Sequence, residues 1–128
     1  LNFGARLNET LKAAENLLKK GVAITVVDAR FAKPLDENLI WQLATTHEAI
    51  MTIEEGSIGG FGSHVVNFLT KKGLMDSNLK FRSLTLPDIF IDQDTPDKMY
   101  KVANLDSVSI EEKVLDLLNS NIVLKKQN

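Results

Sequence analysis

The sequence contains no cysteine, and that absence removes several kinds of chemistry together. Disulfide bonds, thiolate metal sites and cysteine nucleophiles are all excluded. Basic residues are scattered along the chain and the net charge is −2, so the basic stripe that nucleic-acid binding requires is missing. No apolar run approaches the roughly 18 residues of a membrane-spanning helix. We therefore expect neither a nucleic acid nor a membrane as partner.

The length and composition of the chain are typical of a single globular domain. Its 128 residues are 44% hydrophobic and 25% charged. A domain of this size buries roughly two thirds of the surface of its unfolded chain, which is enough for a self-sufficient core. The first residues, Leu1-Asn2-Phe3-Gly4, are strand-like and lack an initiator methionine. Because domains seldom begin inside a buried strand, we expect a fragment of a longer polypeptide.

Apolar, β-branched runs alternate with segments of helical periodicity along the chain. This alternation predicts an α/β fold in three layers, with a mostly parallel sheet between helices. Strands are expected at residues 1–3, 22–27, 49–53 and 79–86, the last at an edge of the sheet.

Residues that start and stop helices support this division of the chain. Helix starts are expected at Asp36 and at Thr95-Pro96, and helix ends at Gly21 and Gly73. A capping box at residues 109–112 is expected to open the last helix. The first helix is expected to bury one apolar stripe, made of Leu7, Leu11, Ala14 and Leu18.

The glycine-rich stretch at residues 54–63, EEGSIGGFGS, follows a predicted strand and leads into a predicted helix. In that geometry backbone N–H groups converge on one point and favour a negative charge there. A phosphate is one candidate, but a P-loop ends in Gly-Lys-Ser/Thr, and here the order is Gly62-Ser63-His64. Each glutamate would also repel a unit negative charge by roughly 3 kcal/mol, at about 5 Å and an effective dielectric near 20. We predict that a glutamate of the protein itself fills the hollow, and that the loop is structural or forms an interface rather than a ligand site.

Charged residues beside the predicted strands allow more than one interpretation. Glu54 and Glu55 are adjacent, so on an extended strand they point to opposite faces and cannot act as a facing carboxylate pair. Asp28, Arg30 and Lys33 form a charged cluster after the second strand. This cluster is either a salt-bridged strand exit or a contact to a neighbouring domain or subunit.

Neither histidine belongs to a recognisable catalytic or metal pattern. His47 closes the second helix and His64 lies in the first turn of the third, and a two-histidine metal site lacks an acidic partner at a known spacing. Trp41 lies off the apolar stripe of its helix, which favours an interface. Residue chemistry alone therefore indicates a docking or structural module. Its candidate contact residues are Asp28, Arg30, Lys33, Glu54, Glu55, Gly59, Gly60, Phe61 and His64.

Five motifs, in order along the chain, resemble those of one family. They are residues 1–4 (LNFG), 28–36 (DARFAKPLD), 47–49 (HEA), 52–65 (TIEEGSIGGFGSHV) and 86–88 (LPD). Together they are similar to the carboxyl-terminal domain of the 1-deoxy-D-xylulose-5-phosphate synthases of bacteria and plastids. That family is related to the transketolases and to the β subunits of 2-oxoacid dehydrogenases. The resemblance covers residues 1–118, and residues 119–128 form a polar tail without a match.

The resemblance implies a full enzyme that uses thiamine diphosphate and Mg²⁺ to join pyruvate and glyceraldehyde 3-phosphate with loss of carbon dioxide. Its product serves isoprenoid, thiamine and pyridoxal synthesis, in the bacterial cytoplasm or in a plastid. In this family the cofactor, metal and substrate residues lie on two preceding domains, so no catalytic, cofactor-binding or metal residue is carried onto this chain. The resemblance implies that this domain contacts those preceding domains and takes part in a homodimer.

The resemblance also implies a sheet of five strands, the first of them antiparallel and N-terminal to Leu1. This chain is therefore expected to show four strands, in the spatial order second, first, third, fourth. Two other functions stay open. One is the equivalent domain of a 2-oxoacid dehydrogenase β subunit, which helps to hold an acyltransferase core; the other is a free-standing regulatory or scaffolding module.

Overall fold

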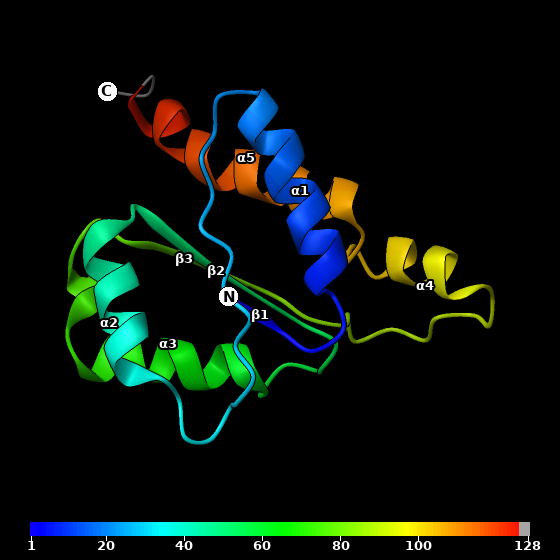
Figure 1. Ribbon diagram of the computed structural model, residues 1–128, viewed down its shortest axis with the longest axis horizontal. Helices are drawn as coiled ribbons and strands as arrows, with labels where there is room; N and C mark the ends of the chain where they lie inside the picture. Colours follow the sequence, from blue (N-terminus) through cyan, green and yellow to red (C-terminus); the bar gives the residue numbers. More distant parts are fainter. Residues whose placement is uncertain (126–128) are drawn as a thin grey trace.

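A parallel three-stranded sheet runs through the middle of the molecule between two layers of helices (Figure 1). The computed structural model describes the backbone of residues 1–125 and the side chains of residues 1–119. The strands lie in the order β1 (Asn2–Phe3), β2 (Ala49–Glu54) and β3 (Lys80–Leu84). Helices α1 (Leu7–Lys19) and α5 (Ser107–Lys125) cover one face, and α2 (Glu37–Thr46) and α3 (Phe61–Lys71) cover the other. The short elements η1 (Leu74–Asp76) and α4 (Pro96–Val102) belong to the connections. The predicted α/β fold in three layers is confirmed.

The central strand β2 separates two apolar cores. Successive side chains of a strand point to opposite faces. Ile50 packs into the core beneath α2 and α3, whereas Ile53 packs into the core beneath α1 and α5. Both faces of β2 are thus covered, which explains why its sequence is apolar almost without interruption.

The prediction of a strand at residues 22–27 is wrong, because the structure has no strand there. The segment is extended, but it joins the sheet through one isolated bridge, between Asn2 and Asp28. There the N–H of Asn2 donates to the Val27 carbonyl, and the N–H of Ala29 donates to the Asn2 carbonyl, each over 2.8 Å. The predicted spatial order is kept, with this segment beside β1, but the structure has three strands instead of four. β1 has only two residues, so among the described residues it supplies a partner at Asp28 but none for residues 22–26.

The buried stripe of α1 is also not the predicted one. The helix buries Thr10, Ala13 and Leu17, whereas Leu11 and Leu18 are 43% and 65% exposed. Asn2 is fully buried on this side of β1, and its side-chain oxygen accepts a hydrogen bond of 3.2 Å from the Thr10 hydroxyl. Because a buried amide needs a polar partner, α1 is turned so that Thr10 rather than leucine faces the sheet.

Most predicted helix ends are confirmed. Asp36 caps α2 by accepting a hydrogen bond from Leu39 N over 3.0 Å, α4 begins at Pro96, and Gly21 and Gly73 follow helix ends with positive φ. The capping box at residues 109–112 is wrong, because α5 begins at Ser107 and the Asp106 carboxylate accepts from Ser109 N instead. None of the helices in the described residues is long and apolar enough to span a membrane. The predicted boundary at residue 118 falls inside α5, and residues 126–128 lie outside the described residues.

The amino group of Leu1 is buried between the layers and donates to the Met51 carbonyl over 2.7 Å. Burial lowers the pKa of this amino group from 8.0 to about 6, because a charged ammonium loses its hydration. Between these values the unfolded chain holds a proton that the folded chain lacks, so stability rises with pH across that range.

We predict that the free energy of unfolding of a chain beginning at Leu1 rises by about 2 kcal/mol between pH 6 and pH 8. Urea titrations across this range measure it. An Nα-acetylated chain is the matched control, because it lacks the titrating amine and loses this part of the pH dependence. An equal slope in both chains would contradict the assignment.

Candidate functional site

The carboxyl ends of the strands, where ligands and partners of parallel sheets usually meet, are closed by the glycine-rich turn between β2 and α3. This turn spans residues 55–60, and α3 begins at Phe61. The turn contains Glu55, Gly59 and Gly60 of the predicted contact residues, and Glu54 and Phe61 flank it at the end of β2 and the start of α3.

Glu54 fills the hollow at the N-terminus of α3. Its carboxylate is 3% exposed and accepts two backbone hydrogen bonds, from Phe61 N over 3.0 Å and from Gly62 N over 2.6 Å. Two free N–H groups and the positive end of the helix dipole are thereby neutralised by one carboxylate. The prediction that a glutamate of the protein occupies this hollow is confirmed.

Glycines make room for that carboxylate. A Cβ atom on Gly60 would lie 2.0 Å from Glu54 Oε1, and one on Gly56 would lie 2.6 Å from the same oxygen. Gly59 has a φ of +105°, a conformation that side chains rarely adopt, and its N–H donates to the Ser63 hydroxyl over 3.1 Å. The glycines of the turn are therefore explained by the enclosed glutamate and by the turn itself.

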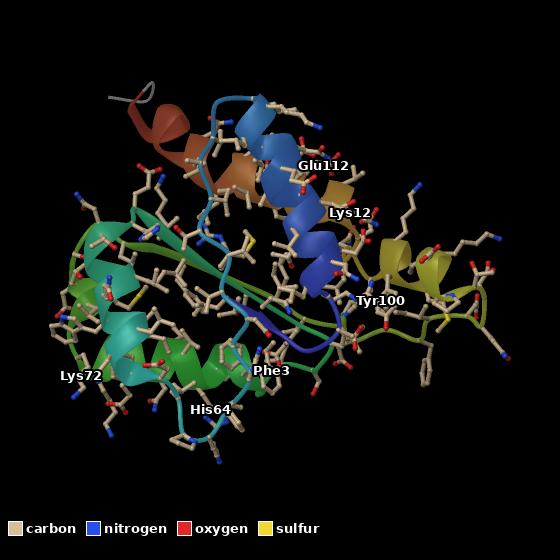
Figure 2. All side chains as sticks on the ribbon, viewed as in Figure 1. Phe3, Lys12, His64, Lys72, Tyr100 and Glu112 are labelled. Carbon is tan, nitrogen blue, oxygen red and sulfur yellow. The ribbon has the colours of Figure 1, made fainter. Side chains whose placement is uncertain are left out.

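The first turn of α3 also lies directly against the sheet. A Cβ on Gly62 would lie 2.3 Å from Ser83 Oγ and 2.6 Å from Thr52 Oγ1, and these two hydroxyls are hydrogen-bonded to each other over 3.0 Å. On the other side, the ring of Phe61 stacks on that of Phe3, which Figure 2 labels, with centroids 5.0 Å apart. The helix start is thus fixed against all three strands.

Glu55 points to the opposite face and belongs to a separate cluster. Its Oε1 lies 3.0 Å from Arg6 Nε, and the guanidinium carbon of Arg6 lies 3.4 Å from the centroid of the Tyr100 ring. Arg6 Nε and Glu55 Oε1 are both buried, and the angle between them does not meet the criterion for a hydrogen bond. Their contact is therefore described as an ion pair. Figure 2 shows Tyr100, on α4, beside the start of α1. A hydrogen bond to the Glu55 carboxylate is the main cause that raises the pKa of Tyr100.

The predicted cluster after the second extended segment is present but open to solvent. Arg30 Nε lies 3.3 Å from Asp28 Oδ2, with the two side chains 78% and 39% exposed, and Lys33 is exposed as well. His64 is half-buried in the first turn of α3, away from the Arg6–Glu55–Tyr100 cluster (Figure 2). The contact roles of these residues stay predictions.

Arg6, Tyr100 and Phe3 were missed by sequence reasoning. Each lies about 45 or more residues from its partner on the turn, so no local spacing signals the contact. The only available hint was an arginine directly before a helix, where a cation is unfavourable unless an acid lies nearby.

A comparison with protein families decides what kind of domain this is. Residues 1–110 match the family model described as transketolase, C-terminal domain. The chain belongs to this family. Transketolase C-terminal domains are parts of enzymes that depend on thiamine diphosphate.

The turn before α3 in this transketolase C-terminal domain does not fit the diphosphate of that cofactor. The one set of converging helix N-terminal amides at the turn is engaged by Glu54, whose negative charge opposes a phosphate. Among residues with described side chains, no group of three histidines or acids is placed to hold a metal ion.

We predict that Glu54→Gln lowers the free energy of unfolding by about 1–3 kcal/mol, because the amide is a weaker acceptor at the helix terminus and brings an unpaired N–H₂ into a buried site. Chemical denaturation measures the loss. Glu48→Gln, at an exposed position just before β2, is the control and should change stability by less than about 0.5 kcal/mol. Equal effects of both substitutions would show that the enclosed carboxylate adds no stability.

We predict that Gly60→Ala costs about 2 kcal/mol in the natural sequence, because the methyl group meets the Glu54 carboxylate. In a Glu54→Ala background the same substitution should cost less than about 0.5 kcal/mol, since the obstructing atoms are gone. A double-mutant cycle by urea denaturation measures this coupling. Costs that simply add would mean that another contact, not Glu54, requires the glycine.

Proposed function

We propose that this chain is the carboxyl-terminal domain of a 1-deoxy-D-xylulose-5-phosphate synthase, in which it forms interfaces and carries no chemistry of its own. The intact enzyme uses thiamine diphosphate and Mg²⁺, bound by its other domains, to condense pyruvate with glyceraldehyde 3-phosphate in the cytoplasm of a bacterium or in a plastid. The motifs of residues 28–36 and 52–65 support this choice within the transketolase-type enzymes.

The single observation that carries the structural role is the position of Glu54. The hollow where the sheet could have received an anionic ligand is closed by the protein's own carboxylate. The turn is then free to act through its outer surface, where the side chain of Ile58 is 80% exposed.

Three connections that follow strands or the extended segment each carry an exposed apolar side chain. Ile58 follows β2, Phe90 follows β3 and is fully exposed, and Phe31 follows the extended segment and is 70% exposed. Large apolar side chains that are this exposed favour contact with another protein surface. We propose that the preceding domains and the second subunit contact the domain at these connections.

The family match applies equally to the equivalent domain of a 2-oxoacid dehydrogenase β subunit. That alternative predicts that the whole protein binds a lipoyl acyltransferase core. Co-purification of such an acyltransferase would favour it, whereas an upstream coding sequence with Gly-Asp-Gly followed by an asparagine, in a single polypeptide, would favour the synthase.

We predict that calorimetry of this chain with thiamine diphosphate and Mg²⁺ shows no saturable binding in the micromolar range. The intact polypeptide, given the same cofactors with pyruvate and glyceraldehyde 3-phosphate, should form 1-deoxy-D-xylulose 5-phosphate, measured by mass spectrometry. Micromolar binding to this chain would contradict the structural role. Pyruvate decarboxylation without condensation would contradict the choice of synthase.

A further inference from the structure

The connection between β3 and α4 projects from the body of the domain and presents apolar side chains to solvent (Figure 1). Phe90 is fully exposed and Ile89 is 60% exposed. A phenylalanine exposed to this extent forgoes the free energy of burial, which contact with another surface would recover. We call residues 87–94 the acidic arm, because they include three aspartates and no basic residue.

The acidic arm is fixed at its base. The N–H of Leu86 donates to the Gly56 carbonyl over 2.9 Å, and the side chains of Leu86 and Ile91 pack against the core beneath α1 and α5. Ile91 therefore points inward, whereas Ile89 and Phe90 point outward. Side chains that are presented from a fixed base lose less conformational entropy when they bind.

A pocket of about 370 Å³ lies between the loop of residues 28–36, the start of α2 and the start of α3. This volume is within the range of ~300–1,000 Å³ that is typical of binding pockets, so one aromatic ring fits inside it. Phe90 of the same chain is not part of the lining. The lining is mostly apolar and includes Phe31, Pro34, Leu35, Leu39, Ile40 and Phe61.

Basic side chains stand at the rim of this pocket. The side chain of Arg30 is 78% exposed, and Lys33 is exposed and makes no ion pair within the part of the chain that the structure describes. The two carboxylates of the same loop are already engaged. Asp28 Oδ2 lies 3.3 Å from Arg30 Nε, and Asp36 caps α2. The other donors of the Arg30 guanidinium and the Lys33 ammonium therefore remain available to a partner.

The acidic arm carries the opposite charge around its exposed aromatic ring. Asp94 is paired with Lys98 over 3.2 Å, but Asp88 and Asp92 make no ion pair with any described residue. These two carboxylates flank Phe90 in the chain. An aromatic side chain between acids thus corresponds to an apolar pocket beside bases. Complementary charges of this kind select a partner and set its orientation.

We propose that the acidic arm of each of two copies of this chain docks into the pocket of the other copy, so that Phe90 inserts beside Phe31. The aspartates of the arm then face the basic residues of the rim. Because each copy offers one arm and one pocket, a two-fold axis satisfies both contacts and the assembly closes as a dimer. This pairing rests on the proposed function, because it names the partner of connections that we assign to interfaces.

Sedimentation equilibrium of this chain tests the pairing. We expect a monomer–dimer equilibrium with a dissociation constant below ~100 μM, as for a weak, transient interface. Phe90→Ser should leave the chain monomeric up to ~1 mM, because a two-fold dimer loses two buried anchors. The matched control is Leu18→Ser, which removes an apolar side chain that is 65% exposed on α1, outside both surfaces. It should change the dissociation constant by less than ~2-fold.

Charge reversal tests the match between the arm and the rim. Lys33→Glu should weaken the dimer by about 5–10-fold, and so should Asp88→Lys combined with Asp92→Lys, since like charges then face each other. A chain that carries all three substitutions should dimerise more tightly than either variant, because opposite charges face each other again. Added NaCl should weaken the dimer of the unsubstituted chain.

Three results would overturn the proposal. The first is a chain that stays monomeric at millimolar concentration. The second is a dimer that Phe90→Ser leaves intact, because another surface would then hold it together. The third is growth beyond a dimer, because the contacts would not close around a two-fold axis. The cofactor calorimetry and the product assay do not depend on this contact, so the pairing and the proposed function fail separately.

Discussion

The bond between the Glu54 carboxylate and the first N–H groups of α3 is the interaction on which the carboxyl end of the sheet depends. It joins the end of the central strand to the start of the helix that covers it, and it does so with a buried charge held by two backbone donors and a helix dipole. Removal of the carboxylate group would leave those donors unpaired in a buried site. The turn, its glycines and the approach of α3 to Thr52 and Ser83 all follow from this one contact.

The same contact decides what this end of the domain can do. In many α/β proteins a helix N-terminus at this place receives a ligand phosphate. Here the N–H groups at the start of α3 are hydrogen-bonded to Glu54 of the same chain, so they are not available to a ligand phosphate. A member of the transketolase C-terminal family that acts as a contact module within a larger catalyst is consistent with this arrangement.

Local signals in the sequence were sufficient to predict the three layers, the starts of α2 after Asp36 and of α4 at Pro96, and the glutamate enclosed by the turn. They failed where the structure depends on residues far apart in the chain. Segment 22–27 has the composition of a strand, but a strand also needs a partner, and β1 supplies one only at Asn2. The stripe of α1 was misassigned because a single buried amide, Asn2, selects Thr10 over the leucines. The Arg6–Glu55–Tyr100 cluster joins three distant regions and leaves no periodic trace in the sequence.

In the turn after β2, the residues that face Glu54 must be small, whereas the residues that face solvent are not restricted in size. Gly56 and Gly60 face the enclosed carboxylate and tolerate no added atom, whereas Ser57 and Ile58 face solvent. The outer residues can therefore be exchanged to suit a different neighbour without disturbing the helix start. A turn whose inner residues are fixed and whose outer residues can vary would allow the same fold to form interfaces with many different partner surfaces.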